Sequence, residues 1–587
     1  MANTSGGGIL AAMLAAEGVE KVFGIIDGTY TQLFWNCVRQ GMQLVTPRHE
    51  SIAAHMAGAY ARLTGKLGVC IASNGPGVAN MLPGVAVEQA EGNRVLLITS
   101  SRRRGVSYPD RGGAYQCFDQ VSVIAPMAKW SRTVSGIERL PELMRRALSR
   151  CWQGRPGVVH LDVPEDLING EARPVTIQQP SQYRPTLPPV PREDQLQEAL
   201  EMLEQARLPI VHCGSGVIHA AAWKELAQLA ERLHAPVTTS WSARGVLPET
   251  SPLAWPMVHI KAVNQLRNQA DLVLVLGSEL GETDWWGKAP YWAPPERQRI
   301  VQVDIDTRRL GRNRPADLAL QADVKEFLRR LLAMLPEPDE NTLRERRERV
   351  AALAAERDQD RAKLDEKLSD RASPMVTAHV AHVCRQVFDD DAVVVIDGGN
   401  AAVWANFYYQ LRVPNTQLGT HHFGHLGAGV GQALGACVAR PDRQVCCITG
   451  DGAMGFHPQE IETAVRNGLK PVFLVCVDRQ WGMVKINQIF TMKPYQALIK
   501  KAVLKRDLGG EETVNTELGE IAWDEMARAM GAHGERVSAP DKLRPALERA
   551  LAAQRCAVIH VEVDPEKHMF APGLMHFKAM HQEPKGR

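Results

Sequence analysis

Two aspartates stand 27 residues apart, each after an apolar run, in the last third of this 587-residue chain. The run Gln444–Thr449 leads into Gly450-Asp451-Gly452-Ala453-Met454, and Pro471–Val477 leads into Asp478. If both runs are strands of a parallel sheet, both carboxylates lie at the edge where open α/β sheets bind ligands. Carboxylate oxygens suit Mg²⁺, and glycines before a helix let backbone N–H groups approach a diphosphate. The pattern therefore predicts a site for Mg²⁺ and a diphosphate.

A third carboxylate, Glu50, closes the segment Thr46-Pro47-Arg48-His49-Glu50, which we expect to end a short strand and to lead into a helix at Ser51–Leu63. At this position it could stabilise the helix dipole. It could also carry a proton, because an apolar setting raises the pKa of a carboxyl group. A second glycine-rich segment, Asn74-Gly75-Pro76-Gly77, follows along the chain.

The composition is that of a globular protein with several domains. Hydrophobic residues make up 45% and charged residues 23%, which excludes wholesale disorder, and the length predicts three or four domains. A formal net charge of +2 provides no global field for nucleic acid or an anionic membrane. We find no apolar run long enough to span a membrane and no pattern of a secretory signal. Eleven cysteines without a C-x-x-C pair indicate a reduced, cytoplasmic protein.

Short apolar runs alternate with helical patterns, which is typical of βαβ units. We expect an α/β protein of three doubly wound parallel-sheet domains, at residues 1–172, 190–336 and 375–565. The charged segment 337–374 is expected to be a helical linker, and the tail 566–587 could be disordered or could close over a site as a lid. Four strands are predicted in each domain: Val19–Ile26, Leu67–Ala72, Val95–Thr99 and Gly157–Val163; Leu208–Cys213, Ala235–Thr239, Leu272–Leu276 and Arg299–Val303; Ala392–Ile396, Gln444–Thr449, Pro471–Val477 and Ala557–Val563.

These motifs resemble those of thiamine-diphosphate (ThDP) enzymes of the acetolactate synthase, pyruvate oxidase and benzaldehyde lyase family. In that family Gly-Asp-Gly opens a stretch that ends at an Asn at the same interval. The resemblance implies that Asp451, position 478 and the Gln480 carbonyl bind Mg²⁺. It also implies that Glu50 bonds N1′ of the aminopyrimidine and so promotes loss of the C2 proton. Asp478 replaces the usual Asn, and its charge could strengthen Mg²⁺ binding or weaken binding of the diphosphate.

The resemblance assigns roles to further residues. Gln116 is expected to face the bound intermediate, and Leu426 is expected to prop the cofactor into its bent shape, unless it is an ordinary core residue. His421 or His422 could donate a proton near neutral pH, or could lie in a solvent-exposed loop. The other cofactor-binding candidates are Asn74, Gly75, Asn400, Gly450, Gly452, Ala453, Met454 and Met483. The other substrate-facing candidates are Asp27, Thr29 and again Met483.

The implied activity is that of a ThDP- and Mg²⁺-dependent lyase or carboligase. Its substrate would be a 2-oxo acid or related carbonyl donor, and the reaction would pass through a C2 ylide and an enamine. One alternative is a sulfoacetaldehyde acetyltransferase-like enzyme that forms acetyl phosphate, because Gln480-Trp481-Gly482 with Lys485 resembles that enzyme. Another is a non-catalytic regulatory or scaffold member of the fold. Arg102-Arg103-Arg104 could receive an anionic substrate group or could be a surface cluster.

The middle domain holds FAD in some relatives and ADP or a CoA ester in others. Its glycine-rich turns are compatible with a nucleotide, but Trp285-Trp286 departs from the flavin-binding stretches, so we expect no FAD. The resemblance also implies a homodimer or homotetramer. Glu50 of one subunit and Asp451 of another would then serve one cofactor.

Overall fold

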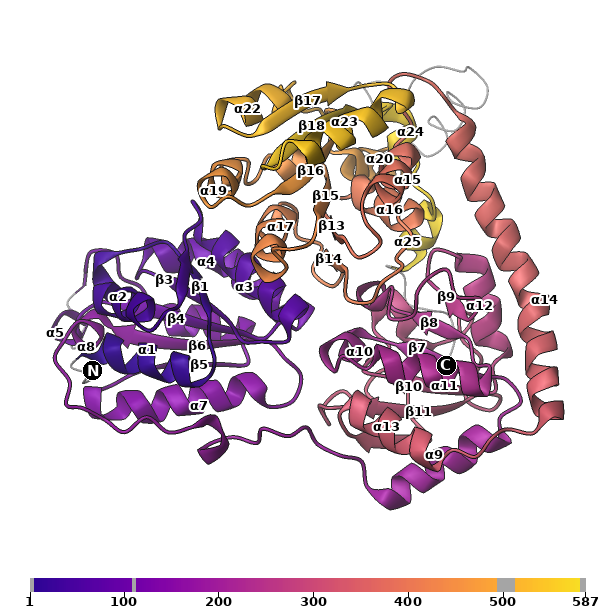
Figure 1. The fold of residues 1–587 in the computed structure, drawn as a ribbon, viewed down its shortest axis with the longest axis horizontal. Helices are drawn as coiled ribbons and strands as arrows, with labels where there is room; N and C mark the ends of the chain where they lie inside the picture. The colour runs from indigo at the N-terminus through magenta and orange to yellow at the C-terminus, as the bar shows by residue number, and fades with distance from the viewer. Residues whose placement is uncertain (1–4, 108–111, 493–512, 581–587) are drawn as a thin grey trace.

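The computed structural model describes residues 5–107, 112–492 and 513–580. In these ranges three sheets contain six strands each, and every strand pairing within them is parallel. The expected α/β class with three parallel-sheet domains is therefore confirmed (Figure 1). No helix of the described ranges has the length and apolar character needed to cross a membrane.

The first and third sheets share one topology. Their strand orders are β2-β1-β3-β4-β6-β5 and β14-β13-β15-β16-β18-β17. Counted along the chain, both orders are 2-1-3-4-6-5. The strands of the first sheet are β1 Lys21–Gly24, β2 Gln43–Val45, β3 Gly68–Ala72, β4 Val95–Ser101, β5 Trp130–Thr133 and β6 Val158–Pro164. Those of the third are β13 Val393–Ile396, β14 Gln417–Gly419, β15 Val445–Gly450, β16 Pro471–Val477, β17 His533–Val537 and β18 Ala557–Glu562.

The middle sheet has a different order, β12-β11-β10-β7-β8-β9. Read from its other edge this is 3-2-1-4-5-6, the doubly wound order of dinucleotide-binding domains, with its switch point between β7 and β10. The strands are β7 Pro209–Cys213, β8 Val237–Thr239, β9 Ala254–Trp255, β10 Leu272–Leu276, β11 Arg299–Asp304 and β12 Leu318–Gln321.

Both faces of the first sheet are covered by helices. Val69 and Ile71 of β3 belong to a core with α1 (Gly6–Ala16), α2 (Thr31–Arg39) and α7 (Leu140–Trp152). Cys70 and Ala72 belong to the opposite core, with α3 (Glu50–Thr64) and α4 (Pro76–Glu91). Successive side chains of a strand point to opposite faces, so a strand buried on both faces is apolar at every position.

The second of these cores continues into the third domain, where α3 packs against α17 (Ala428–Ala439). Glycines allow the close approach. A Cβ at Gly435 would lie 2.6 Å from the carbonyl oxygen of Met56, and one at Gly431 would lie 2.7 Å from the Cβ of His55. The other face of the third sheet shares a core with the middle domain.

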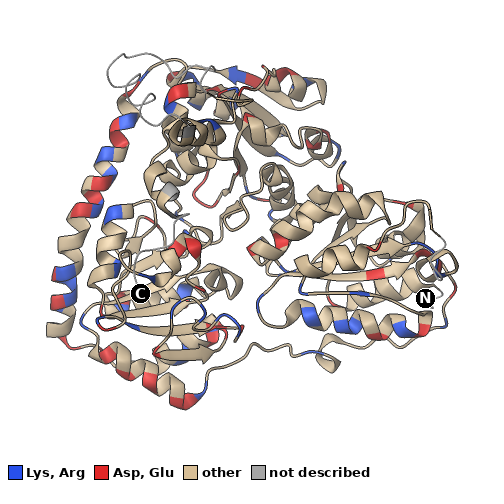
Figure 2. Ribbon diagram, turned by 180° about the vertical axis from the view of Figure 1, so that it is seen from behind, with Lys and Arg blue, Asp and Glu red and all other residues tan. Residues whose placement is uncertain are grey.

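The helix α14 (Glu340–Asp365) runs along the outside of the molecule beside the middle and third domains (Figure 1). Acidic and basic residues are interspersed along it (Figure 2). The C-terminal segment then forms α24 (Pro565–Met569) and α25 (Leu574–Met580). The indole N–H of Trp404 donates to the carbonyl of His568 at 2.9 Å, which holds α24 on the third domain.

Candidate active site

A cavity opens at the carboxyl edge of the third sheet, where β15 leads into α18 (Asp451–Met454) and β16 ends before Asp478. It brings together most of the residues predicted to bind the cofactor and metal: Asn400, Leu426, Gly450, Asp451, Gly452, Ala453, Asp478, Gln480 and Met483. Met454 is different, because it is fully buried in the core beneath α18.

The two aspartates lie side by side in this cavity with little solvent exposure. Asp451 accepts the backbone N–H groups of Gly452 at 2.7 Å and Arg479 at 2.8 Å. Burial, and then the charge of Asp478, raise the pKa of Asp451 to about 7. Burial likewise raises the pKa of Asp478 to about 6. Among the described residues no Lys or Arg forms an ion pair with either carboxylate, so a divalent cation fits the charge that the pair lacks.

Asn400 is the strongest sign that this cavity takes a polar ligand. It opens α16 (Asn400–Tyr408), is 4% exposed, and neither its amide oxygen nor its amide nitrogen has a hydrogen-bond partner. Buried polar groups in native proteins are normally paired. A Cβ at Gly482 would lie 2.8 Å from the Asn400 amide nitrogen, so glycine keeps this space open. The unpaired amide, the glycines and the carboxylates fit a diphosphate held through Mg²⁺.

Two residues that sequence reasoning had not placed here complete the surroundings of Asp478. The Nζ of Lys485, on α20 (Gly482–Met492), donates to Oε1 of Gln480 at 2.8 Å and to Glu517 at 2.6 Å. The imidazole of His568 lines the cavity from the tail, with Nε2 3.9 Å from Oδ2 of Asp478. It lies 90 residues after Asp478, in the tail that was expected either to be disordered or to close over a site, but nothing in the sequence singled out the histidine itself.

A second group of predicted residues assembles in the first domain. Asp27 accepts the hydroxyl of Thr29 at 2.6 Å, and that hydroxyl lies 2.6 Å from the hydroxyl of Ser100. Ser100 in turn accepts the backbone N–H of Asn74 at 3.0 Å, and the side-chain amide of Asn74 donates to the carbonyl of Gln116 at 2.8 Å.

Gly75 packs against the same segment. A Cβ there would lie 2.6 Å from the carbonyl oxygen of Gln116, and its φ of 62° suits glycine. Gln116 itself has a φ of 53°. The structure thus places the glycine-rich turn with Asn74 and Gly75 in contact with Gln116, the residue expected to face the substrate.

Glu50 lies at the first turn of α3, where the His49 side chain caps the helix by accepting from the Ser51 N–H. Its Oε2 accepts the side-chain amide of Asn80 at 3.0 Å. Burial, and then the charges of Asp27 and Glu50, raise the pKa of Tyr30, so both carboxylates lie near that ring.

These two groups of residues are separate within one chain. In the part of the chain that the structure describes, only residues 398–484 and His568 line the cavity around Asp451. Glu50 contacts its own domain through Asn80. Within the described part of a single chain, the two groups therefore do not share one cavity.

Neither group includes His421 or His422. The Nδ1 of His422 lies 3.1 Å from Oε2 of Glu91, and Glu91 also accepts the backbone N–H groups of His422 and Phe423. The ring of His421 lies against Gly419, where a Cβ would be 3.0 Å from its Nε2. The carboxylate at the end of α4 therefore fixes this loop, and neither histidine is among the described residues that line the cavity around Asp451.

The three arginines after β4 form ion pairs with acidic residues of their own domain. Arg102 and Arg103 lie 3.3 and 3.2 Å from Glu165, and Arg104 lies 2.9 Å from Asp166. They form an ion-paired surface cluster, which was one of the two interpretations of this triplet.

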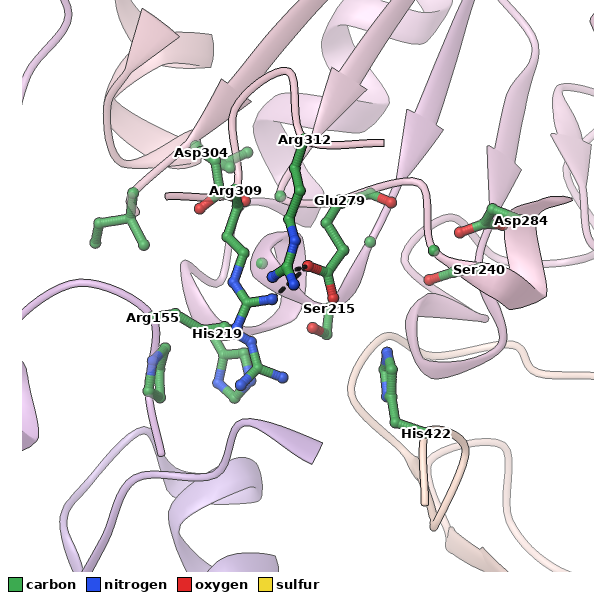
Figure 3. A pocket seen from close by; sticks show the side chains of 18 of the residues that line it. Arg155, Ser215, His219, Ser240, Glu279, Asp284, Asp304, Arg309, Arg312 and His422 are labelled. Atoms are coloured by element: carbon green, nitrogen blue, oxygen red, sulfur yellow. Dashed lines mark hydrogen bonds and ion pairs between the residues drawn. The ribbon is translucent and has the colours of Figure 1, made fainter. Parts of the chain in front are cut away.

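A larger cavity, of about 390 Å³, lies at the switch point of the middle sheet (Figure 3). Arg309 and Arg312 face Glu279 across it, and Glu279 pairs with Arg309. Arg155 of the first domain and His422 of the third also line it. Its other lining residues include the glycine-rich turns after β7 and β10, together with Trp286.

The two tryptophans that depart from the flavin-binding stretches, Trp285 and Trp286, both adopt a left-handed backbone conformation. Trp285 and Trp286 each have a φ of 56°, which is rare for bulky side chains. Trp285 is buried and stacks on Tyr291 with ring centroids 3.4 Å apart, whereas Trp286 reaches the cavity. Sequence reasoning singled out this pair but not its conformation.

Family models of thiamine pyrophosphate (ThDP) enzymes match most of the chain. The N-terminal TPP binding domain matches residues 4–123, the central domain 196–331 and the C-terminal TPP binding domain 397–561.

Several relatives match over almost the whole chain. The probable acetolactate synthase large subunit of Methanocaldococcus jannaschii is 28% identical over 581 residues, which cover 95% of this chain and 92% of that protein. The acetolactate synthase large subunit IlvG of Mycobacterium tuberculosis is 30% identical over 569 residues, covering 95% and 96%. The sulfoacetaldehyde acetyltransferase of Alcaligenes xylosoxydans is 30% identical over 576 residues, covering 92% and 89%. The chain belongs to the thiamine pyrophosphate enzyme family and is a ThDP-dependent enzyme.

Proposed function

We propose that this enzyme is a Mg²⁺-dependent lyase or carboligase that makes or breaks a C–C bond beside a carbonyl group, with a 2-oxo acid or related compound as donor. The observation that supports it best is the buried pair Asp451 and Asp478 beside the unpaired amide of Asn400. The names of the acetolactate synthase relatives support the donor class.

Each half of the site has a distinct task in this proposal. Bound ThDP would supply the carbon nucleophile and accept the electrons released beside the carbonyl. Asp451 and Asp478, with the carbonyl of Gln480, would hold Mg²⁺, and Asn400 would bind the diphosphate. Leu426 would support the aminopyrimidine from the cavity wall.

Glu50 would hold and transfer a proton at its carboxyl oxygens, where it faces N1′. Asp27 and Gln116 lie in the same first-domain group and would face the substrate. Because this group lies outside the cavity around Asp451, we propose a homodimer or homotetramer with sites between subunits. A small-molecule carbonyl compound is the only other partner in this proposal.

A second candidate is transfer of an acetyl group to phosphate. The sulfoacetaldehyde acetyltransferase relatives favour it. Lys485, part of the segment that resembles that enzyme, is bonded to Gln480 and Glu517. It would therefore support the metal-binding loop and would not bind phosphate in this arrangement.

The test is a calorimetric titration of ThDP into metal-stripped protein, with and without Mg²⁺, followed by assays on pyruvate and on sulfoacetaldehyde, each with and without phosphate. Product formation from pyruvate without phosphate would support the carboligase. Strict dependence on phosphate would support the acetyltransferase. Absence of ThDP binding in the presence of Mg²⁺ would contradict both and leave the non-catalytic member of the fold.

A further inference from the structure

The cavity of the third domain contains one carboxylate more than the family pattern, because Asp478 stands where an Asn is usual. Asp451 and Asp478 are each 7% exposed, and both carboxyl groups lie at the same sheet edge. Such a pair of buried like charges is unfavourable unless something neutralises it.

Among the described residues, the cations around this pair already have acidic or neutral partners of their own. The guanidinium of Arg479 turns to Glu562 at 2.8 Å, although its backbone N–H binds Asp451. Lys485 pairs with Glu517 at 2.6 Å. The Nδ1 of His568 lies 2.6 Å from the hydroxyl of Thr377. Among the described residues, therefore, no full positive charge is left over for the two aspartates.

The surrounding structure nevertheless holds Asp478 in place. The side-chain amide of Gln480 donates to its Oδ2 at 3.1 Å and to the carbonyl of Pro565 at 2.8 Å. The other end of that amide is fixed by Lys485 at 2.8 Å. Asp451 is fixed by two backbone N–H groups. Both metal-binding carboxylates are thus positioned by the protein alone, without help from a diphosphate.

An independent feature indicates that a ligand belongs here. The amide of Asn400, 4% exposed and without any hydrogen-bond partner, lines the same cavity. The N–H groups of an amide can donate to a metal-bound diphosphate. The amide carries no charge, so it does not offset the negative charge of the two carboxylates.

On the basis of the function proposed above, we propose that this site binds its divalent cation first and without ThDP, and that the diphosphate enters only a metal-loaded site. Two preorganised carboxylates attract the cation on their own, whereas one carboxylate and an amide would rely on the diphosphate for part of the negative charge. The same two carboxylates repel a diphosphate when the cation is absent. Asp478 is the residue that determines this order.

The experiment uses the metal-stripped full-length protein and two probes, Mn²⁺ alone and ThDP alone. Free Mn²⁺ is followed by electron paramagnetic resonance, and ThDP binding by calorimetry. We expect saturable binding of Mn²⁺ without ThDP and no binding of ThDP without a metal. In Asp478→Asn, the affinity for Mn²⁺ alone should fall by about tenfold or more, because one of two buried charges is lost. Binding of ThDP without metal should then become measurable.

Asp541→Asn is the matched control, because it removes the same charge from an exposed position on α23 (Pro540–Ala552). It should bind both probes like the original chain. The measurements on the original chain need no variant, so they test the order of binding even if Asp478→Asn folds poorly.

The possible failures are distinguishable. Mn²⁺ binding that requires ThDP, or equal Mn²⁺ affinity in the original chain and a folded Asp478→Asn, would overturn the metal-first order and leave the proposed function standing. If Mn²⁺ and ThDP fail to bind even together, the proposed function itself is wrong, and the metal-first order falls with it.

Discussion

Glu50 is the residue on which proton transfer depends in the proposed function. The change Glu50→Gln preserves the size of the side chain and can keep a contact with Asn80, but an amide cannot exchange a proton as a carboxyl group does. We expect turnover to fall by about 10²- to 10⁴-fold, the usual contribution of general acid–base catalysis, with ThDP affinity within a few-fold of the original. Steady-state kinetics and calorimetry measure the two quantities.

Glu138→Gln, an exposed glutamate of the first domain, is a suitable control and should leave both values unchanged. Retention of most of the activity in Glu50→Gln would remove Glu50 from the mechanism.

Asn400 offers a test of the diphosphate site that does not depend on the substrate. Its amide is buried without a partner in the absence of ligand, so Asn400→Ala should leave the free energy of unfolding of the cofactor-free protein unchanged or higher. ThDP affinity in the presence of Mg²⁺ should fall by about tenfold, as expected for the loss of one or two hydrogen bonds. Thermal unfolding with and without ThDP measures both effects.

Asn406 lies on the same helix, and its replacement is expected to have the opposite effect on the stability of the cofactor-free protein. Its amide is fully used, since it donates to Ala402 and accepts from Arg244 and Gln417. Asn406→Ala should therefore destabilise the cofactor-free protein. If both variants lose stability equally, Asn400 is a structural residue.

The residues that the sequence could identify are those at strand ends. The spacing of Asp451 and Asp478 was enough to predict that the two carboxylates share one sheet edge. Each follows a buried strand, and the two parallel strands are neighbours that end at the same edge. Asn80 reaches Glu50 through a tertiary contact that no local pattern encodes, and for His568 the sequence suggested only that its tail could cover a site. His422 stands close to Leu426 in the sequence, but Glu91 binds its backbone and its side chain, and it is not among the described residues that line the cavity with Leu426.

At the scale of elements, the predicted strands are the four central strands of each sheet. Five of the six edge strands, β5, β9, β12, β14 and β17, were not among the predicted strands. The reason is physical: a central strand such as β10 is buried at every position, whereas β17, His533–Val537, is buried only at its last residue. Most of these edge strands have partial exposure and mixed polarity, so they lack the continuous apolar run that marks a buried strand. The exception is β9, which is buried but has only two residues.

The contact between α3 and α17 joins the first and third domains, and its close approach depends on glycine. In Gly435→Ala the new Cβ would lie 2.6 Å from the carbonyl oxygen of Met56, a backbone atom that cannot rotate away. We expect a loss of about 1–3 kcal/mol in the free energy of unfolding, typical of overpacking. Urea unfolding measures it.

Gly105→Ala is the control, because a Cβ at that position meets nothing within 4 Å. Equal stability of the two variants would mean that the helices can separate without cost.

The same domain contact predicts a dependence on pH. His457 is buried next to three other imidazoles, those of His49, His55 and His425; burial, and then their charges, lower its pKa to about 3. In the unfolded chain this imidazole has the ordinary pKa of about 6.5, so protons bind the unfolded chain first and favour unfolding below that pH. The stability of the folded protein is therefore complete with respect to His457 above about pH 6.5 and is lost as the pH falls toward 3. Between pH 6.5 and 5 the loss is at most about 2 kcal/mol.

Chemical unfolding at pH 7.5 and pH 5 checks this prediction in the original chain and in His457→Gln. The variant cannot bind the proton, so its stability should fall less between the two pH values. An equal fall in both proteins would assign the acid sensitivity to other groups.

At the scale of the whole molecule, the first and third domains repeat one strand order although no residue-level repeat is visible in the sequence. Topology is set by which strands pair, and many apolar sequences satisfy the same pairing. The two domains present different chemistry at their carboxyl edges: Glu50 and Asp27 in one, the aspartate pair and Asn400 in the other. In the proposed function one cofactor needs both kinds of edge, and the described residues of one chain do not bring them into one cavity.

The proposed division of the site between subunits predicts complementation between two inactive variants. Glu50→Gln lacks the proton carrier and Asp451→Asn lacks a metal ligand, so each should be inactive alone. If each site combines Glu50 of one subunit with Asp451 of another, a mixed dimer contains one intact site and one doubly altered site. Unfolding and refolding the two variants together in equal amounts should therefore restore about one quarter of the original activity, because half of the randomly formed dimers are mixed.

Mixing the variants without unfolding them is the control, since preformed dimers that do not exchange subunits should stay inactive. Sites built within a single chain would give the opposite result, because every site would then retain one of the two defects. No activity after refolding, in a sample where the original chain refolds to full activity, would show that each chain completes its own site. A yield near one quarter would instead identify the dimer as the smallest active unit, because only a second chain can supply the missing Glu50 or Asp451.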